Sequence, residues 1–68
     1  MWDYHTNPTR WILTIGSWRA IVQRLADPPV RWSPSIEQLV EPHDRYNGPV
    51  SDDPIRVRTW CLTKIAQL

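Results

Sequence analysis

The sequence of 68 residues has one cysteine, two glycines and no phenylalanine, and these shortages exclude several kinds of site. Because Cys61 is the lone cysteine, an internal disulfide is excluded and a cysteine-based metal site is disfavoured. Gly16 and Gly48 lie far apart, so the sequence contains no glycine-rich phosphate loop. His5 and His43 are also far apart and show no metal-ligand spacing. We therefore expect no cofactor and no bound metal.

Long hydrophobic runs are absent as well. No apolar stretch approaches the roughly 18 to 20 residues that span a bilayer, because Arg19 and Arg24 interrupt the best candidate. The N-terminal residues lack the apolar core of a signal peptide. The formal net charge is +1, which gives no strong attraction to nucleic acid or to an anionic membrane. These absences predict an intracellular, cytoplasmic protein with no membrane partner.

Tryptophan is the abundant large side chain, with five copies in the sequence. A chain of this length is near the size at which one hydrophobic core is marginally sufficient. A fully buried large apolar side chain contributes roughly 1.5 to 3 kcal/mol to stability. We therefore expect a single domain over residues 1–68, with a core built largely from tryptophan.

Gly16-Ser17 separates two short apolar runs and predicts a β-hairpin over residues 9–25. Glycine readily takes the positive φ that the first central position of a type II′ turn requires. Folding the chain about this turn sets Ile15 opposite Trp18. One face of the hairpin then carries six apolar side chains, namely Trp11, Leu13, Ile15, Trp18, Ala20 and Val22.

A helix from Trp11 to Leu25 is the alternative for the same segment. Its apolar residues also recur at helical spacing, with Asn7 as a cap and Pro8 at the first helical position. Gly16 in the interior of this helix would cost about 0.8 to 1 kcal/mol. The hairpin is therefore the preferred interpretation.

The segment after the Asp27-Pro28-Pro29 turn predicts a third strand around residues 30–40, because its apolar residues alternate. Pro34 lacks a hydrogen to donate and requires an edge position or a bulge in such a strand. A three-stranded meander would supply the edge position. A short helix over residues 33–40, capped by Ser33, remains the alternative.

The last part of the sequence predicts an amphipathic helix over about residues 52–68. Ser51 is a suitable N-cap, and Val50 and Ile55 are spaced for a hydrophobic staple. One face carries an apolar stripe made of Val57, Cys61, Leu62, Ile65 and Leu68. Residues 1–8 are expected to be an extended N-terminal segment, and residues 42–50 a loop.

Together these elements predict an α+β fold in which a small antiparallel β-meander packs against one C-terminal amphipathic helix that covers the tryptophan face. The pattern is a strand around Trp18 and Ala20, another around Trp32, and then a helix. In this layout, over about residues 10–66, the chain resembles the plant AP2 domain and the arm-binding domain of some phage integrases. The resemblance is one of pattern alone, and a fold does not carry its function with it.

The polar face of the predicted hairpin is the main candidate site for binding a partner. It would carry Arg10, Ile12, Thr14, Arg19, Ile21 and Gln23. Arginine and glutamine make bidentate contacts to guanine and adenine edges, whereas arginine among aliphatic side chains is also typical of protein interfaces. An ordinary solvated face is the third interpretation. Trp60 and Trp2 are further candidates, because each either caps the core or anchors a partner.

No combination of residues predicts catalysis. His43-Asp44 lies in the predicted loop, and the sequence places no nucleophile within its reach. Cys61 lies on the apolar stripe, where a small buried side chain is expected. We therefore expect a non-enzymatic binding protein, an accessory subunit, adaptor or inhibitor of a larger protein or protein complex. That role would also suit a phage or mobile-element protein. The alternative is a sheet-mediated DNA-binding protein, with nucleic acid as the partner.

Overall fold

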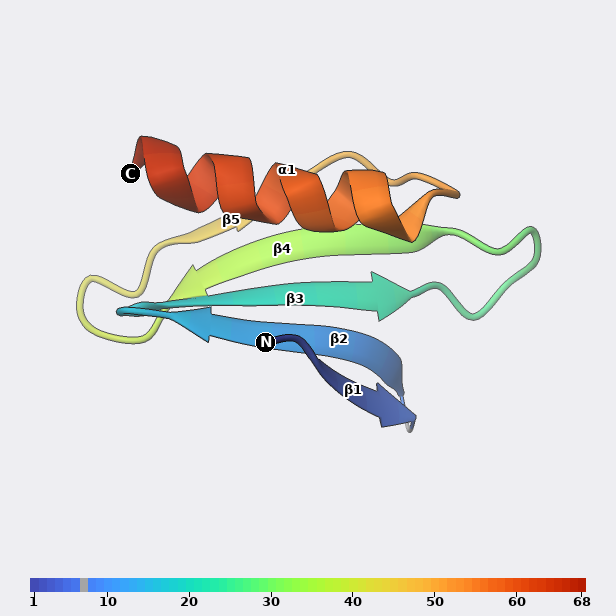
Figure 1. The fold of residues 1–68 in the computed structure, drawn as a ribbon, viewed down its shortest axis with the longest axis horizontal. Helices are drawn as coiled ribbons and strands as arrows, with labels where there is room; N and C mark the ends of the chain where they lie inside the picture. The colour runs from blue at the N-terminus through green and yellow to red at the C-terminus, as the bar shows by residue number, and fades with distance from the viewer. Residues whose placement is uncertain (7) are drawn as a thin grey trace.

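The computed structural model describes residues 1–6 and 8–68. Five strands form one antiparallel sheet in the order β1-β2-β3-β4-β5, and a C-terminal helix packs on one of its faces (Figure 1). The elements are β1 (Asp3–Thr6), β2 (Thr9–Ile15), β3 (Trp18–Arg24), β4 (Trp32–Gln38), β5 (Arg45–Asn47) and α1 (Pro54–Gln67). The predicted α+β meander with a C-terminal helix is confirmed, although the sheet is wider than expected.

The β2–β3 hairpin has the predicted turn and register. Gly16 has a φ of 58°, and among the described residues His43 is the one non-glycine residue with a positive φ. A positive φ at Gly16 followed by a negative φ at Ser17 is the combination found in type II′ turns. Ile15 lies opposite Trp18 as expected, so the helical alternative for this segment is wrong.

Strand β4 contains Pro34 and is nevertheless an inner strand, which corrects the expected edge position. The Pro34 carbonyl accepts a hydrogen bond from the Gly48 N–H at 3.0 Å, so the proline nitrogen also points toward β5. β5 ends at Asn47, just before this position, and the chain next pairs with β4 at Ser51, opposite Trp32. The β4–β5 ladder is therefore interrupted where Pro34 has no hydrogen to donate.

Two short strands extend the sheet beyond the predicted meander. β1 forms within the N-terminal segment 1–8 and sets Tyr4 opposite Trp11. β5 forms within the predicted loop 42–50 and sets Tyr46 opposite Ile36. The loop prediction is therefore wrong for residues 45–47. Both strands are short and mostly exposed, so they lack the apolar alternation by which longer strands are recognised.

The N-cap of α1 is Asp53 rather than the predicted Ser51. The Asp53 carboxylate accepts a hydrogen bond from the Ile55 N–H at 3.0 Å. Ser51 instead bridges to β4, and its hydroxyl accepts a hydrogen bond from the Asp53 N–H at 3.1 Å. The predicted hydrophobic staple is also wrong, because Val50 and Ile55 are both largely exposed.

The hydrophobic core lies between α1 and the middle of the sheet. Its buried apolar members are Ala20, Val22, Trp32, Ile36, Val57 and Cys61. Of the predicted helix stripe, Leu62 and Leu68 are 40% and 54% exposed and lie outside this core. In the described part of the chain, no helix has the length and apolar character needed to cross a membrane.

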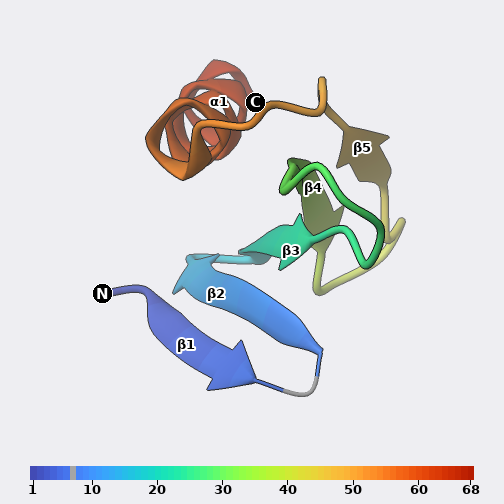
Figure 2. The ribbon, with the colours of Figure 1, turned by 90° about the vertical axis from the view of Figure 1, so that its right-hand side faces the viewer.

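Helix α1 packs along β3 and β4 and leaves the same side of β1 and β2 uncovered (Figure 2). Neighbouring strands lie about 4.8 Å apart, so five strands span roughly 19 Å between the outer strand axes. A helix with its side chains is about 10 Å wide. One helix therefore covers about half of this sheet, and the expected cover of the tryptophan face extends over β3 and β4 but not over β1 and β2.

Candidate functional site

The six hairpin residues predicted to bind a partner lie together on the side of the sheet away from α1. Ala20 and Val22 of β3 are buried beneath the helix, so the residues that alternate with them face the opposite side. We call this side the polar face. Its hairpin residues are Arg10, Ile12, Thr14, Arg19, Ile21 and Gln23, and the register sets Arg10 opposite Gln23, Ile12 opposite Ile21 and Thr14 opposite Arg19.

The other strands add residues to the polar face that the sequence did not reveal. The register continues its rows across β4 and onto the two outer strands. The added residues are Asp3, His5, Ser33, Ser35, Glu37, Arg45 and Asn47. Placing most of them required the pairing of β1 and β5, which are too short to be recognised by alternation. The polar face is therefore wider and carries more acidic groups than expected.

Charges on the polar face partly compensate one another. Arg19 Nη1 lies 3.1 Å from Glu37 Oε1, and both side chains are partly exposed. An ion pair of this kind contributes about 0.2 to 1 kcal/mol. Arg45 lies opposite Glu37 on β5 and places another cation beside the pair. Arg19 is therefore less available to a phosphate than the sequence suggested.

Arg10 of the polar face has a side-chain nitrogen without a hydrogen-bond partner. Its Nε is buried and, among the described residues, it is the one buried side-chain nitrogen or oxygen without a hydrogen-bond partner. A buried donor left without a partner costs roughly 1 to 3 kcal/mol. Gln23 lies opposite Arg10 on β3, so an acceptor supplied at this position would meet two polar side chains together.

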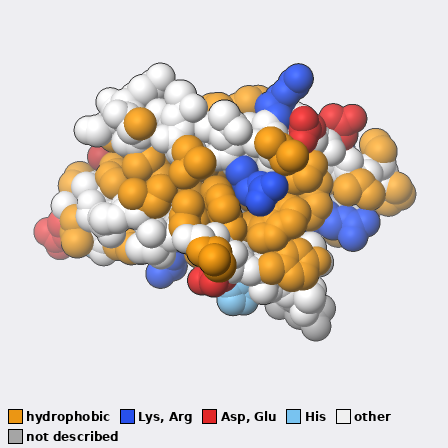
Figure 3. Space-filling view, viewed as in Figure 1, with side chains coloured by type: hydrophobic (Ala, Val, Ile, Leu, Met, Phe, Trp, Pro, Cys, Tyr) orange, Lys and Arg blue, Asp and Glu red, His pale blue; other side chains and the backbone are white. Residues whose placement is uncertain are grey.

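The uncovered side of β1 and β2 forms a second candidate site, which we call the apolar face. Figure 3 views this side and shows hydrophobic side chains next to one another across it, with a basic side chain among them. Its members are Trp2, Tyr4, Trp11, Leu13 and Ile15 below the helix, and Leu62 and Ile65 on the helix flank. Tyr4, Ile15 and Leu62 are 55%, 38% and 40% exposed. Contiguous exposed apolar surface of this kind marks interaction sites in soluble proteins.

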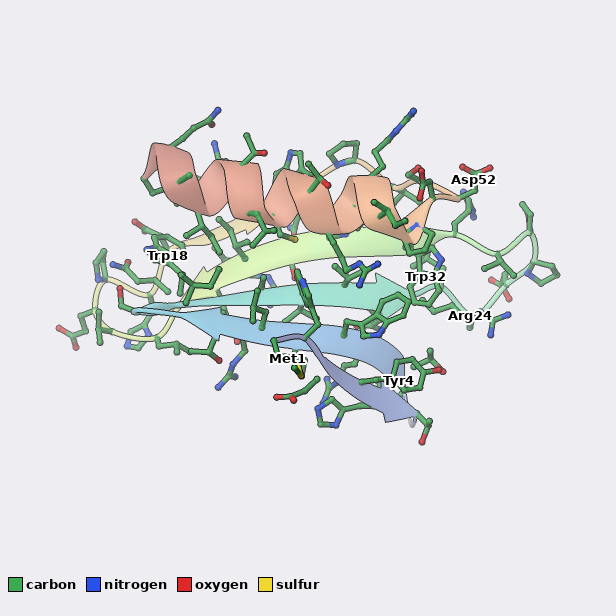
Figure 4. All side chains as sticks on the ribbon, viewed as in Figure 1. Met1, Tyr4, Trp18, Arg24, Trp32 and Asp52 are labelled. Carbon is green, nitrogen blue, oxygen red and sulfur yellow. The ribbon has the colours of Figure 1, made fainter. Side chains whose placement is uncertain are left out.

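Trp11 is the centre of the apolar face. Its ring stacks on Trp32 with 4.7 Å between ring centroids, and the centroid of the Tyr4 ring lies 5.5 Å away. Figure 4 shows Tyr4 and Trp32 toward the same end of the sheet, with Trp18 toward the opposite end. The Arg58 guanidinium lies 5.0 Å from the Trp11 ring centroid, a cation–π distance. Arg58 is therefore held on an aromatic ring at the centre of the apolar face.

The two candidate tryptophans outside the hairpin both pack against the core. Trp60 rests on Gly48, because a Cβ atom at that glycine would lie 2.5 Å from atoms of the indole ring. The indole also lines a hollow of about 220 Å³ together with Pro49 and Val50. Trp2 is half-buried against the core from the N-terminal end. Trp60 thus closes the edge of the core, whereas Trp2 contributes to the apolar face.

The potential catalytic groups are separated from one another. Cys61 is fully buried, and its Sγ donates to the Ser35 carbonyl at 3.8 Å. Burial raises the pKa of the Cys61 thiol from 9.0 to about 11, so the reactive thiolate is scarce at neutral pH. His43 lies in an exposed turn with its Nδ1 3.2 Å from the Gln38 carbonyl oxygen. Within the described residues no group of three or more His, Cys, Asp or Glu side chains could hold a metal ion.

Comparison with known proteins identifies no relative: the sequence matches no protein-family model and no curated protein, and the fold matches no solved structure. The resemblance in layout to AP2 and integrase arm-binding domains therefore rests on the order of strands and helix alone. The candidate sites must be interpreted from their own chemistry.

Proposed function

We propose that this chain is a small non-enzymatic binding protein that attaches to a larger protein as an accessory subunit, adaptor or inhibitor. The observation that carries the proposal is the apolar face, where aromatic and aliphatic side chains continue past the helix onto β1 and β2. Aromatic residues and arginine are enriched in protein interfaces, and Trp, Tyr and Arg dominate the residues whose loss weakens binding most. The apolar face combines all three.

The half-burial of this surface supports the same proposal. Trp2, Trp11 and Leu13 each pack against the core on one side and retain exposed surface on the other. Covering such surface contributes roughly 25 cal/mol for each Å² of apolar area removed from water. Their packing against the core also holds these side chains in place, so less conformational freedom is lost when a partner binds.

Sheet-mediated DNA binding is the second candidate, and the polar face supports it. Arg10 and Gln23 lie opposite each other, and both side-chain types contact base edges in the major groove. The Arg19–Glu37 ion pair weakens this alternative, because it places a carboxylate where a phosphate would approach. Salt dependence separates the two candidates, since phosphate contacts weaken steeply as salt concentration rises.

Capture of partners from the source organism tests the proposal. The tagged full chain is expressed there, and bound protein and nucleic acid are both measured at low and moderate salt. We expect a defined protein partner that survives moderate salt and is lost with Leu62→Gln, which changes the apolar face. The matched variant Arg19→Ala changes the polar face and should retain the partner. Salt-sensitive capture of DNA that is lost with Arg10→Ala would instead support the alternative.

A further inference from the structure

The uncovered half of the sheet has the dimensions of one helix. One helix of about 10 Å width occupies half of a sheet that is roughly 19 Å wide, and a similar width remains over β1 and β2. The seven residues of β2 extend over roughly 23 Å at about 3.3 Å per residue. A helix of about 15 residues, rising 1.5 Å per residue, has the same length.

The flank of α1 that borders this space is apolar apart from one residue. Arg58 contacts Trp11 of β2 and thereby identifies the flank that faces the uncovered strands. Leu62 and Ile65 follow Arg58 by four and seven residues, so they lie on the same flank. The apolar face therefore combines side chains of β1 and β2 with those of the neighbouring flank of α1.

Charge determines which kind of occupant fits. Arg58 is half-buried beside Trp11 and forms no ion pair with any described residue. None of the members of the apolar face is acidic. An occupant that covered this guanidinium would remove it from water, and a buried charge needs a partner of opposite sign. A carboxylate on the occupant would supply a charge-assisted, bidentate hydrogen bond.

A second copy of this chain fits poorly by the same reasoning. Two apolar faces packed together about a two-fold axis would bury two copies of Arg58 and bring no carboxylate to either. Insertion of the second copy's helix fails for another reason. Its outward side presents Thr59, Thr63 and Ala66, all exposed, which offer little to a surface of tryptophan and leucine.

From these observations we infer that the apolar face binds an amphipathic α-helix of another protein, lying beside α1 and carrying an Asp or Glu that pairs with Arg58. The inference rests on the proposed function and specifies the chemistry of its partner. The bound helix would present apolar residues at positions i, i+3, i+4 and i+7 to Trp2, Trp11 and Leu13, the pattern typical of helices that bind in grooves. Two helices would then cover the sheet from edge to edge.

Selection from a displayed library of random 18-residue helical peptides, with the immobilised full chain as the target, tests this inference. We expect the enriched peptides to share the helical apolar spacing and one acidic position. Their affinity should fall about tenfold against Arg58→Glu and recover when the acidic residue is changed to Lys. Arg58→Lys is the matched control, because it keeps the charge. Leu62→Gln, at an exposed helix position, should weaken binding without unfolding the chain, as circular dichroism would show.

The other outcomes overturn the inference, and they separate it from the proposed function. Some peptides could bind Leu62→Gln more weakly and yet lack a carboxylate, or bind Arg58→Glu with unchanged affinity. Either result would leave the binding role intact and refute the charge pairing. Peptides whose affinity is unchanged by both variants would show that they do not bind the apolar face, which would contradict both proposals. Failure to enrich any helical peptide would refute the helical occupant. A chain that sediments as a dimer, and as a monomer with Leu62→Gln, would identify a second copy as the occupant.

Discussion

The two halves of the sheet are built from similar strands but differ in burial. On the helix side of β3 and β4, Ala20, Val22 and Ile36 are fully buried beneath α1. No residue of β1 or β2 is buried, although Trp11 and Leu13 point to the same side of the sheet. Apolar alternation therefore gives the same kind of face two different uses. Where the helix covers it, the face is buried and supplies stability, and where it does not, apolar side chains stay partly exposed.

The aromatic residues make the uncovered half compatible with a folded monomer. Trp11 packs against Tyr4 of β1 and against Trp32 of the covered half, and Arg58 lies over the Trp11 ring. Large rings bury much of their own area by such contacts, so the sheet remains ordered without a second helix. The covered half instead relies on side chains buried beneath the helix, among them Ala20, Val22 and Ile36. This contrast predicts different responses to equivalent substitutions.

The largest effect is expected from Ile36→Ala in the covered half. Ile36 is fully buried, and removing a buried isoleucine to alanine costs about 2 to 5 kcal/mol because it loses apolar burial and leaves a cavity. Ile15→Ala, the matched change in the uncovered half, should alter the free energy of unfolding by about 0.5 kcal/mol, as is usual for surface positions. Urea denaturation measures both. Equal losses would mean that the two halves contribute alike to stability.

Cys61 gives a chemical measure of the same contrast. Burial raises the pKa of its thiol from 9.0 to about 11. At pH 8 the folded chain should therefore react with a thiol reagent about 100-fold more slowly than the urea-unfolded chain, from the loss of thiolate alone. Because the folded state holds the proton more tightly, this group's contribution to stability should be complete below pH 9 and decline between pH 9 and about 11. The free energy of unfolding of Cys61→Ala should decline less over this pH range. Rapid labelling of the folded chain would instead show that the thiol is in contact with solvent.

The features that the sequence predicted are local. The β2–β3 hairpin follows from Gly16 and from the alternation on either side of it, and both signals lie within a few residues of the turn they specify. The helix was also recognised, but its N-cap was not, because Ser51 and Asp53 are both suitable caps. The choice depends on Ser51 pairing with Trp32, a contact between residues distant in the sequence.

The features that the sequence missed are two short strands at the edges of the sheet. β1 and β5 have four and three residues, and neither shows a period that could identify it alone. Without them, the width of the sheet was underestimated and the helix was expected to cover it. The polar face of the hairpin was correctly grouped, since the register determines it. The apolar face could not be anticipated, because its exposure results from a wide sheet carrying one helix.

Gly48→Ala is expected to have a smaller effect than Ile36→Ala. The added Cβ would lie 2.5 Å from the Trp60 ring, so the indole or the loop after β5 must move, and such overpacking costs about 1 to 3 kcal/mol. Thermal unfolding measures the loss. Combining the change with Trp60→Leu should restore part of it, because the smaller side chain leaves room for the methyl group. Losses that simply add would show that the Trp60 contact is not the cause.

The smallest effect is expected on the polar face, for the Arg19–Glu37 ion pair. A double-mutant cycle with Arg19→Ala and Glu37→Ala should give a coupling of about 0.2 to 1 kcal/mol, because both groups remain partly in water. The coupling should shrink as salt rises toward 1 M, where charges are screened within about 3 Å. Thr14→Ala, opposite Arg19 on β2, is the control for loss of a side chain without loss of charge. A larger coupling that salt does not reduce would indicate that the polar face is covered in solution, and the comparison between the faces would then have to be reversed.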